Sequence, residues 1–346
     1  MSRLKPQNSL QTQAKKNGLI FIRQALPGVA VSVVVGFAAL FLSQHYGAPA
    51  MLFALLLGIA LSFIYHETRC KIGIDFTAVH VLRIGVALLG LRIAFDDLIM
   101  MGWSTALLLM VAVVSTIMFG ILLSKALGFS KRFGLLTGGA VGICGASAAM
   151  AISAVLPNTK DKDRDTLLTI IGVTTLSTAT MVIYPIFATY IGFDERQTSI
   201  FLGATIHDVA QVVGAGYSVS EQTGDLATLI KLVRVAYLMP VVLCILLVLK
   251  MNISRNKTSG KAPGFPGFLI AFVCLMALNS LIEIPELVTV VTTDFSRFAL
   301  VVAIAAIGMK SNLAQVSELG FKPVILLVAQ TLWIAGMVTL SIYYIL

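Results

Sequence analysis

The stretch GLLTGGAVGICGASAAMAISAVLP, residues 134–157, decides how the rest of this chain is interpreted. It is long enough to cross a bilayer and carries no charge, but four glycines fall within the eight residues from Gly138 to Gly145. Each glycine in a helix interior costs about 1 kcal/mol relative to alanine. The stretch therefore predicts either a break in the helix or a very close contact with another helix.

A broken helix has chemical consequences. The backbone N–H groups that open its second half attract an anion, together with the helix dipole. Irregular backbone at membrane depth is tolerated only where it is buried in protein or lines a wet cavity. The break therefore predicts a polar, substrate-binding site in the middle of the stretch, which includes Gly142, Ile143, Cys144, Gly145, Ala146 and Ser147. The alternative is a GxxxG-type packing face through Gly134, Gly138 and Gly142.

The composition is that of a membrane protein. The 346 residues are 58% hydrophobic and 12% charged, with a mean hydropathy of +0.94, whereas soluble domains carry about 25% charged residues. We expect an all-α polytopic membrane protein with about 11 transmembrane helices, two of them discontinuous near the midplane. The spans are expected at roughly 26–43, 49–65, 77–94, 103–124, 133–156, 166–191, 198–217, 230–249, 266–282, 295–309 and 322–345.

The net charge of +9 reflects topology rather than nucleic-acid binding. With a cytoplasmic N-terminus, most Lys and Arg residues fall on the inner side, in agreement with the positive-inside rule. This assignment puts Lys131, Arg132 and Arg196 inside, and Arg92 and the 158–165 loop outside. We expect a multi-pass protein of the bacterial inner membrane.

The chain divides into a cytoplasmic tail at 1–25, a first transmembrane portion at 26–249, a cytoplasmic linker at 250–266 and a second portion at 267–346. The second portion repeats roughly residues 49–127. Gly90, Arg92 and Gly102 recur at identical spacing as Gly308, Lys310 and Gly320. The copies are an odd number of spans apart, so they predict an inverted-topology repeat, which is typical of secondary transporters.

A second unusual run, IFLGATIHDVAQVVGAG at 200–216, places His207, Asp208 and Gln211 within apolar sequence. Ionisable groups at the bilayer centre cost about 2.5–3.5 kcal/mol each and usually mark an ion or substrate path. The ordinary pKa of histidine lies near physiological pH, so His207 and Asp208 are the expected coupling residues. The alternative is a structural polar clamp between helices.

Three cations complete the predicted site: Arg83, Lys231 and Arg234. Arg83 either meets an anionic substrate or Asp208, or its side chain reaches the inner interface. Lys231 and Arg234 share a helix face and either form a cationic vestibule, reach inward to a cavity or anchor the helix at the interface.

Three motifs in order, GICGASAAMA, GATIHDVAQVVGAG and KLVRVAYLMP, resemble the membrane-protein family labelled sulfate exporters, or the YeiH family. The likeness covers most of the chain beyond Ala25. It implies the architecture of sodium/proton antiporters and bile-acid symporters, with discontinuous helices that cross near the site, an elevator motion and a homodimer. Carried over by position, the broken helix is 142–147 and its partner is 205–211, from Thr205 to Gln211. Asp208 stands where the family pattern has Glu.

The favoured function is secondary transport of a small anion such as sulfate, a sulfonate or a carboxylate, coupled to H⁺ or Na⁺. Lipid is the other expected partner, and neither a cofactor nor a metal is expected, because the four cysteines lack metal-site spacing. A passive anion channel is the second possibility. A third is an intramembrane serine hydrolase with Ser147 and His207 as nucleophile and base, on the strength of a weak GxSx pattern. We expect no enzyme activity.

Overall fold

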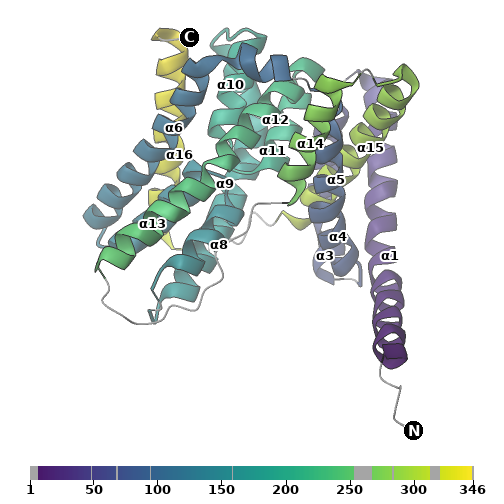
Figure 1. The fold of residues 1–346 in the computed structure, drawn as a ribbon, viewed down its shortest axis with the longest axis horizontal. Coiled ribbons are helices and arrows are strands. Elements are labelled where there is room, and N and C mark those ends of the chain that lie inside the picture. The colour runs from purple at the N-terminus through teal and green to yellow at the C-terminus, as the bar shows by residue number, and fades with distance from the viewer. Residues whose placement is uncertain are drawn as a thin grey trace. The chain divides into compact units, whose positions relative to one another are not determined.

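The computed structural model describes residues 7–344 apart from 48, 68, 94, 158, 253–266, 283 and 312–319. Throughout this described part the regular elements are helices, as the composition predicts. They are α1 (Gln7–Tyr46), α2 (Ala50–Ala60), α3 (Ser62–Glu67), α4 (Lys71–Phe76), the π-helix η1 (Thr77–Val81), α5 (Leu82–Leu89), α6 (Phe95–Ala126), α7 (Lys131–Gly142), α8 (Ala146–Val155), α9 (Lys162–Tyr190), α10 (Glu195–Thr205), α11 (Val209–Tyr217), α12 (Glu221–Ala236), α13 (Leu238–Asn252), α14 (Gly267–Leu281), α15 (Glu286–Lys310) and α16 (Phe321–Tyr344) (Figure 1).

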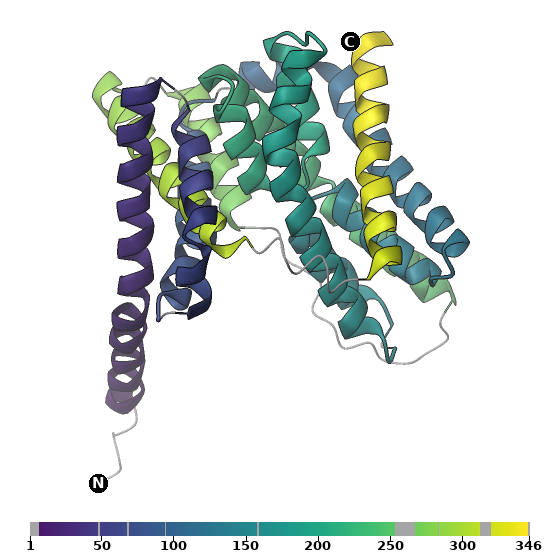
Figure 2. The same ribbon diagram turned by 180° about the vertical axis from the view of Figure 1, so that it is seen from behind.

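The described helices include seven segments that are long and apolar enough to cross a membrane: Phe21–Tyr46, Lys71–Leu89, Met101–Ala126, Lys162–Tyr190, Glu221–Val248, Leu287–Lys310 and Phe321–Tyr344. Three shorter apolar helices accompany them: Ala50–Ala60, Ala146–Val155 and Gly267–Leu281. The chain is thus a multi-pass membrane protein, but the predicted count of eleven spans is not confirmed. Helix α1, purple in Figure 2, begins at Gln7, inside the segment 1–25 that we expected to be a tail.

The chain forms two units, one made of Met1–Val86 with Asp294–Ser311 and the other of Ala87–Thr293 with Asn312–Leu346. In unit 1, helices meet at glycines. A Cβ placed on Gly58 would lie 2.9 Å from the Cα of Gly308, and one on Gly28 would lie 2.8 Å from the Cα of Gly73. Gly308, a member of the predicted repeat, therefore has a packing role of its own.

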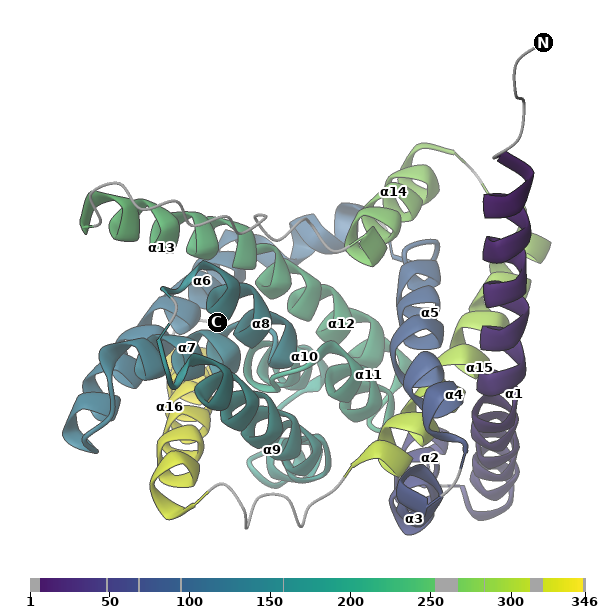
Figure 3. The same cartoon turned by 90° about the horizontal axis from the view of Figure 1, so that it is seen from below.

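In unit 2, the long helices α6 and α16 pack antiparallel. Phe119 stacks on Trp333 with ring centroids 4.6 Å apart, and Ser115 donates to the Sδ of Met337 over 3.1 Å. The residue numbers rise along α6 as they fall along α16. Figure 3 labels both helices beside α7, which packs on each of them.

Helices α7 and α8 form a helical hairpin, here called hairpin A. Lys131 opens α7 and Leu156 follows α8, yet both line one pocket, together with Lys162 at the start of α9. If the two helices continued in line, their outer ends would be about 30–35 Å apart at 1.5 Å per residue. A Cβ on Gly139 of α7 would lie 2.2 Å from Cδ1 of Ile152 on α8. Helix α8 therefore turns back alongside α7.

Helices α10 and α11 form a second hairpin, hairpin B. Ser220, just after α11, donates its hydroxyl to the carboxylate of Glu195, which opens α10. The base of hairpin B follows the end of α9, where Asp194 and Gln197 form a capping box. The base of hairpin A lies at the start of α9, a helix of 29 residues, or about 43 Å. The two hairpins therefore enter unit 2 from opposite ends of α9.

This arrangement corrects two predictions. The runs 133–156 and 198–217 were expected to cross the membrane, but each returns to the end at which it entered. The expected sidedness is wrong as well. Lys131 and Lys162, assigned to opposite sides, line one pocket, and so do Arg92 and Arg196. An apolar run in the sequence does not reveal whether the chain crosses the membrane or turns back within it. Because every run was counted as a crossing, both the paths of these two runs and the sides of the loops were predicted wrongly. The predicted linker at 250–266 falls mostly outside the described residues.

Candidate functional site

The tips of the two hairpins meet. Helix α7 ends at Gly142 and α8 begins at Ala146, while α10 ends at Thr205 and α11 begins at Val209. A Cβ on Gly145, in the tip of hairpin A, would lie 3.6 Å from the carbonyl oxygen of His207 and 3.7 Å from the Cβ of Asp208. Both helices break where the sequence predicted. The packing-face alternative also applies to Gly138, since a Cβ there would lie 2.9 Å from the Cα of Ile117 on α6.

Gly145 is required by its backbone conformation. Its φ of 63° and ψ of −129° lie in a region that side-chain-bearing residues rarely adopt. It is the N-cap of α8 and ends the short turn that reverses the chain after α7. The glycine therefore sets where the second half of hairpin A begins.

Lys231, on α12, joins the two tips. Its side chain is fully buried. Its Nζ donates to the carbonyl oxygens of Ile143 in hairpin A and Ile206 in hairpin B, each over 2.8 Å. One ammonium therefore binds the C-terminal ends of α7 and α10 at once.

Arg234 makes the same connection one turn further along α12. Its Nε donates to Gly142 O over 2.5 Å, and its Nη2 donates to Val141 O. Its Nη1 donates to Ala204 O over 2.7 Å and Ile206 O over 3.0 Å. The guanidinium is also fully buried, so neither cation is an anchor at the interface.

These contacts match charge to helix dipole. The last carbonyls of a helix lack partners within the helix and carry about half a negative charge in total. Two such ends, those of α7 and α10, converge in the interior of unit 2. Removing one partner of a buried charge costs about 3–5 kcal/mol, because the other is left uncompensated. Lys231 and Arg234 therefore stabilise the meeting of the tips.

The opposite poles, the N-termini of α8 and α11, are more accessible. Ser147 in the first turn of α8 is exposed, and Asp208, the N-cap of α11, is partly exposed. The backbone N–H of Asp208 donates to Ser177 Oγ on α9 over 3.1 Å. A solute that reaches the tips therefore meets two helix N-termini and one carboxylate.

His207 is held by α16. Its Nε2 lies 2.9 Å from Thr331 Oγ1, and the Thr331 hydroxyl donates to Leu327 O over 2.8 Å. Since that hydroxyl has one proton, Thr331 accepts from His207, which places the ring proton on Nε2. The His207 ring is fully buried, and its Nδ1 has no hydrogen-bond partner among the described residues.

A second buried acceptor lies one turn along hairpin B. Gln211 is 5% exposed, and its Oε1 likewise lacks a partner within the described chain. The Gln330 amide on α16 donates to Thr137 Oγ1 on α7 over 3.0 Å, while its own Oε1 is unpartnered. These three buried acceptors can bind the hydrogen-bond donors of a solute.

The other predicted site residues are placed as follows. Thr205 is buried, and its hydroxyl donates to Phe201 O. Cys144 is buried in the tip of hairpin A. Arg83 is exposed on α5 and belongs to unit 1. Neither ring nitrogen of His207 contacts Ser147, so no serine–histidine pair is formed in the described structure.

Sequence reasoning missed three contributors: Thr331, Gln330 and Ser177. The adjacent pair Gln330-Thr331 interrupts the apolar run of α16, a signal that could have found both residues. Ser177 lies among several threonines of α9, where one more hydroxyl does not stand out.

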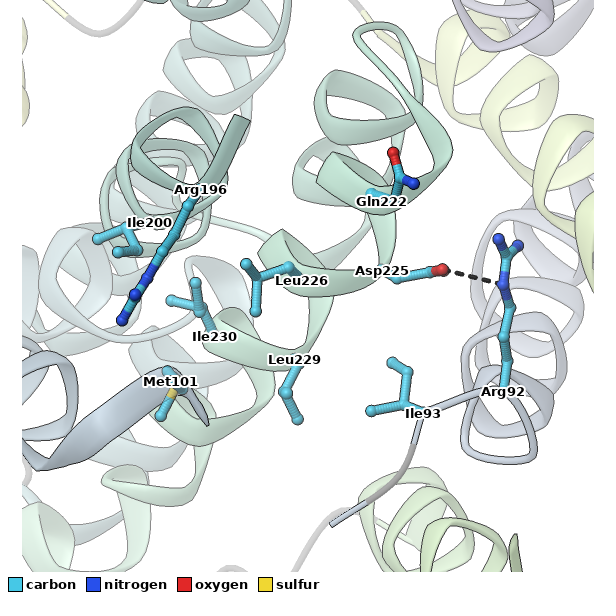
Figure 4. Close-up of a pocket in the computed structure, with 10 residues that line it drawn as sticks. All are labelled: Arg92, Ile93, Met101, Arg196, Ile200, Gln222, Asp225, Leu226, Leu229 and Ile230. Carbon is cyan, nitrogen blue, oxygen red and sulfur yellow. Dashed lines mark ion pairs between the residues drawn. The ribbon is translucent and has the colours of Figure 1, made fainter. Parts of the chain in front are cut away.

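A pocket of about 440 Å³ lies by the base of hairpin B (Figure 4). Its walls are largely apolar side chains from α10 and α12, with Arg196 and Arg92 among the polar ones. Arg92 pairs with Asp225 over 2.9 Å and with Glu221 over 3.0 Å. The segment after α5 is thereby fastened to α12, the helix that carries Lys231.

Comparisons with known proteins give matches that cover most of the chain. A family model described as "Conserved hypothetical protein 698" matches residues 27–327. The chain is 49% identical to UPF0324 membrane protein CT0845 of Chlorobaculum tepidum, covering 96% of this chain and 93% of the relative. It is 51% identical to UPF0324 membrane protein RB0971 of Rhizobium meliloti, covering 96% and 97%. It is 49% identical to UPF0324 membrane protein TauZ of Paracoccus pantotrophus, covering 96% and 99%. No solved structure matches the chain. The chain belongs to the conserved hypothetical protein 698 family of UPF0324 membrane proteins.

Proposed function

We propose that this protein is a secondary active transporter of a small anionic solute, which it exports or exchanges by alternating access. The observation that carries the proposal is the meeting of two broken helical hairpins that enter from opposite ends of α9. Discontinuous helices provide transporters with free helix termini for substrate and coupling ions. Because one hairpin enters from each end of α9, each hairpin can close the path of the solute at its own end.

We further propose an inverted repeat, which would support this function. Hairpin A with α9, and hairpin B with α12, are similar units that enter from opposite ends. The matched glycines are Gly102, near the start of α6, and Gly320, just before α16, and they have φ values of 80° and 79°. Two opposed copies allow two states of similar energy, one open to each side.

The site favours an anion that also carries hydrogen-bond donors. The N-termini of α8 and α11 suit an anionic group, whereas His207 Nδ1 and Gln211 Oε1 suit N–H donors. An aminosulfonate has both an anionic group and N–H donors. The TauZ name of two relatives suggests a link to taurine, so taurine is the first solute to test, with sulfate and small carboxylates next.

Charge supports an orientation in the bacterial inner membrane. Near the start of α9, the described chain has the basic residues Lys125, Lys131, Arg132, Lys160, Lys162 and Arg164. Near its end lie Arg92 and Arg196 among Glu195, Glu221 and Asp225. The positive-inside rule puts the start of α9 in the cytoplasm. Hairpin A then opens to the inside and hairpin B to the outside.

His207 is the proposed proton-coupling group, with Asp208 beside it. The Nδ1 can accept a proton. The backbone groups of Val141 and Thr205 beside the ring would stabilise the resulting charge, and the cations Lys231 and Arg234 would oppose it. Protonation would also turn His207 Nδ1 from an acceptor into a hydrogen-bond donor, in a region that contains the buried acceptors Gln211 Oε1 and Gln330 Oε1.

Counterflow in proteoliposomes tests the function. Vesicles loaded with unlabelled taurine, sulfate or a carboxylate should accumulate the labelled solute transiently, and vesicles without protein should not. A carrier gives saturable exchange, whereas a channel gives a current that is linear in voltage. If none of these solutes moves faster than through empty vesicles, the transporter proposal is wrong.

A further inference from the structure

The carbonyl groups at the hairpin tips are already occupied. The free carbonyls at the end of α7 accept from Lys231 or Arg234 at Val141, Gly142 and Ile143, and those at the end of α10 accept from the same two cations at Ala204 and Ile206. Both cations are fully buried. Two basic side chains therefore lie where the two negative helix ends converge.

In sodium-coupled transporters with broken helices, unwound carbonyls and half-helix C-termini coordinate Na⁺. Such an ion needs several oxygen ligands. Here the same class of oxygens binds side-chain N–H groups. A Na⁺ close to the Lys231 ammonium would be repelled by its positive charge, and the low dielectric constant of the interior strengthens this repulsion. A sodium site and this cation pair exclude each other.

We propose that Lys231 and Arg234 are built-in substitutes for a coupling cation, so that the joined tips need no Na⁺. This inference rests on the proposed function for its meaning in transport, but the stability of the tips can be measured without any transport. Lys231 and Arg234 are positioning residues in this role. They hold hairpins A and B together as one body while the N-termini of α8 and α11 face the solute.

The neighbours of Lys231 agree with this role. The charged or titratable groups that act on it are Arg234 on its own helix, Cys144 in hairpin A, and Asp208 and His207 in hairpin B. Asp208 is the one acidic side chain in this set, and it lies at the opposite, N-terminal pole of hairpin B. The carbonyl groups at the tips, rather than a carboxylate, are therefore the direct partners of the ammonium.

Thermal unfolding of the purified full chain in detergent tests the proposal. The unfolding temperature is measured in NaCl, KCl and choline chloride at equal ionic strength. The wild-type value should be the same in all three salts. A Na⁺ site filled at 100 times its dissociation constant would raise it by about 4 °C. A saturable, Na⁺-specific rise in the wild type would overturn the proposal.

Substitutions sharpen the test. Lys231→Ala should lower the unfolding temperature, and added methylammonium or Na⁺ should restore part of the loss by filling the vacated position. Lys231→Arg, which keeps the charge, should stay insensitive to Na⁺, as should the control Lys322→Ala at the exposed start of α16. No gain from either cation in a folded Lys231→Ala would contradict the proposal. If that variant does not fold, the effect of Na⁺ on the unfolding temperature of the wild type and of Lys231→Arg still tests the proposal.

A transport measurement separates this inference from the proposed function. Exchange by the wild type should proceed at the same rate when choline replaces Na⁺ on both sides. Exchange that requires Na⁺ would overturn the inference and leave the transporter proposal standing. Absence of exchange for every solute would overturn the transporter proposal, and the unfolding measurement would still decide the inference.

Discussion

Lys231 and Ile143 are 88 residues apart in the chain, yet the Lys231 ammonium donates to the Ile143 carbonyl over 2.8 Å in a fully buried position. The same ammonium reaches Ile206 over 2.8 Å. One side chain therefore fixes two chain reversals that periodicity alone could not connect. Because the cations sit at the C-terminal poles, the N-terminal poles of α8 and α11 are left for the solute.

Gly145→Ala should damage transport. Alanine at a φ of 63° is strained by about 1–3 kcal/mol, and the strain falls where α8 begins, so the exchange rate should fall about tenfold. The measurement is counterflow at matched protein content. Gly192→Ala is the control, since Gly192 has a φ of 76° and a Cβ there meets nothing within 4 Å. Equal rates for both variants would argue against a site at the tips.

Thr331→Val should destabilise the protein and impair exchange. It leaves the His207 Nε2–H buried without an acceptor, at a cost of about 1–3 kcal/mol. The pH profile of exchange should also change, because the ring loses the contact that fixes its tautomer. Thr105→Val is the control. Thr105 is equally buried, and its hydroxyl donates to Met101 O in its own helix. A wild-type pH profile in Thr331→Val would count against His207 as the coupling group.

Arg92→Met should lower the stability of unit 2 by about 1–3 kcal/mol, since hydrogen bonds to charged groups are worth about that much. The pair with Asp225 is mostly shielded, with side chains 24% and 17% exposed. Arg164→Met is the matched control, because its pair with Asp161 is 3.9 Å long and 70% exposed on both sides. Thermal unfolding in detergent should separate the variants. Equal losses of stability in the two variants would show that the Arg92–Asp225 pair stabilises the protein no more than an exposed ion pair does.

Labelling of single cysteines tests the hairpin topology. The background replaces Cys70, Cys144, Cys244 and Cys274 with alanine. Arg132→Cys and Arg164→Cys should react with an impermeant thiol reagent from one side of the membrane, and Arg196→Cys from the other. All three side chains are exposed. Labelling of positions 132 and 164 from opposite sides would mean that hairpin A crosses the membrane.

The sequence predicts the breaks better than the path of the chain. Glycine clustering indicates a break within 134–157, because glycine disfavours a continuous lipid-facing helix. The bounds 142–147 and the partner break at 205–211 come from the resemblance. A break does not reveal whether the next segment continues or turns back. That choice depends on contacts between distant residues, such as Gly139 with Ile152 and Ser220 with Glu195.

For the two cations, the sequence likewise predicts the residues but not their partners. Their residue types and spacing mark Lys231 and Arg234 as candidates, since a basic pair within apolar sequence is costly. Their partners are backbone carbonyls, which every residue has. No pattern of side chains can identify such partners, and only the fold brings them together.

Oxidative cross-linking of Gly145→Cys with Asp208→Cys, in the cysteine-free background, tests the meeting of the hairpin tips most directly. The Cβ positions are 3.7 Å apart, within the range of about 3.5–4.5 Å for a disulfide. Mass spectrometry of peptides from oxidised membranes should find the 145–208 cross-link in high yield. A pair of Gly145→Cys with Gly192→Cys should give none. A yield for the 145–208 pair no higher than for this control would contradict the account.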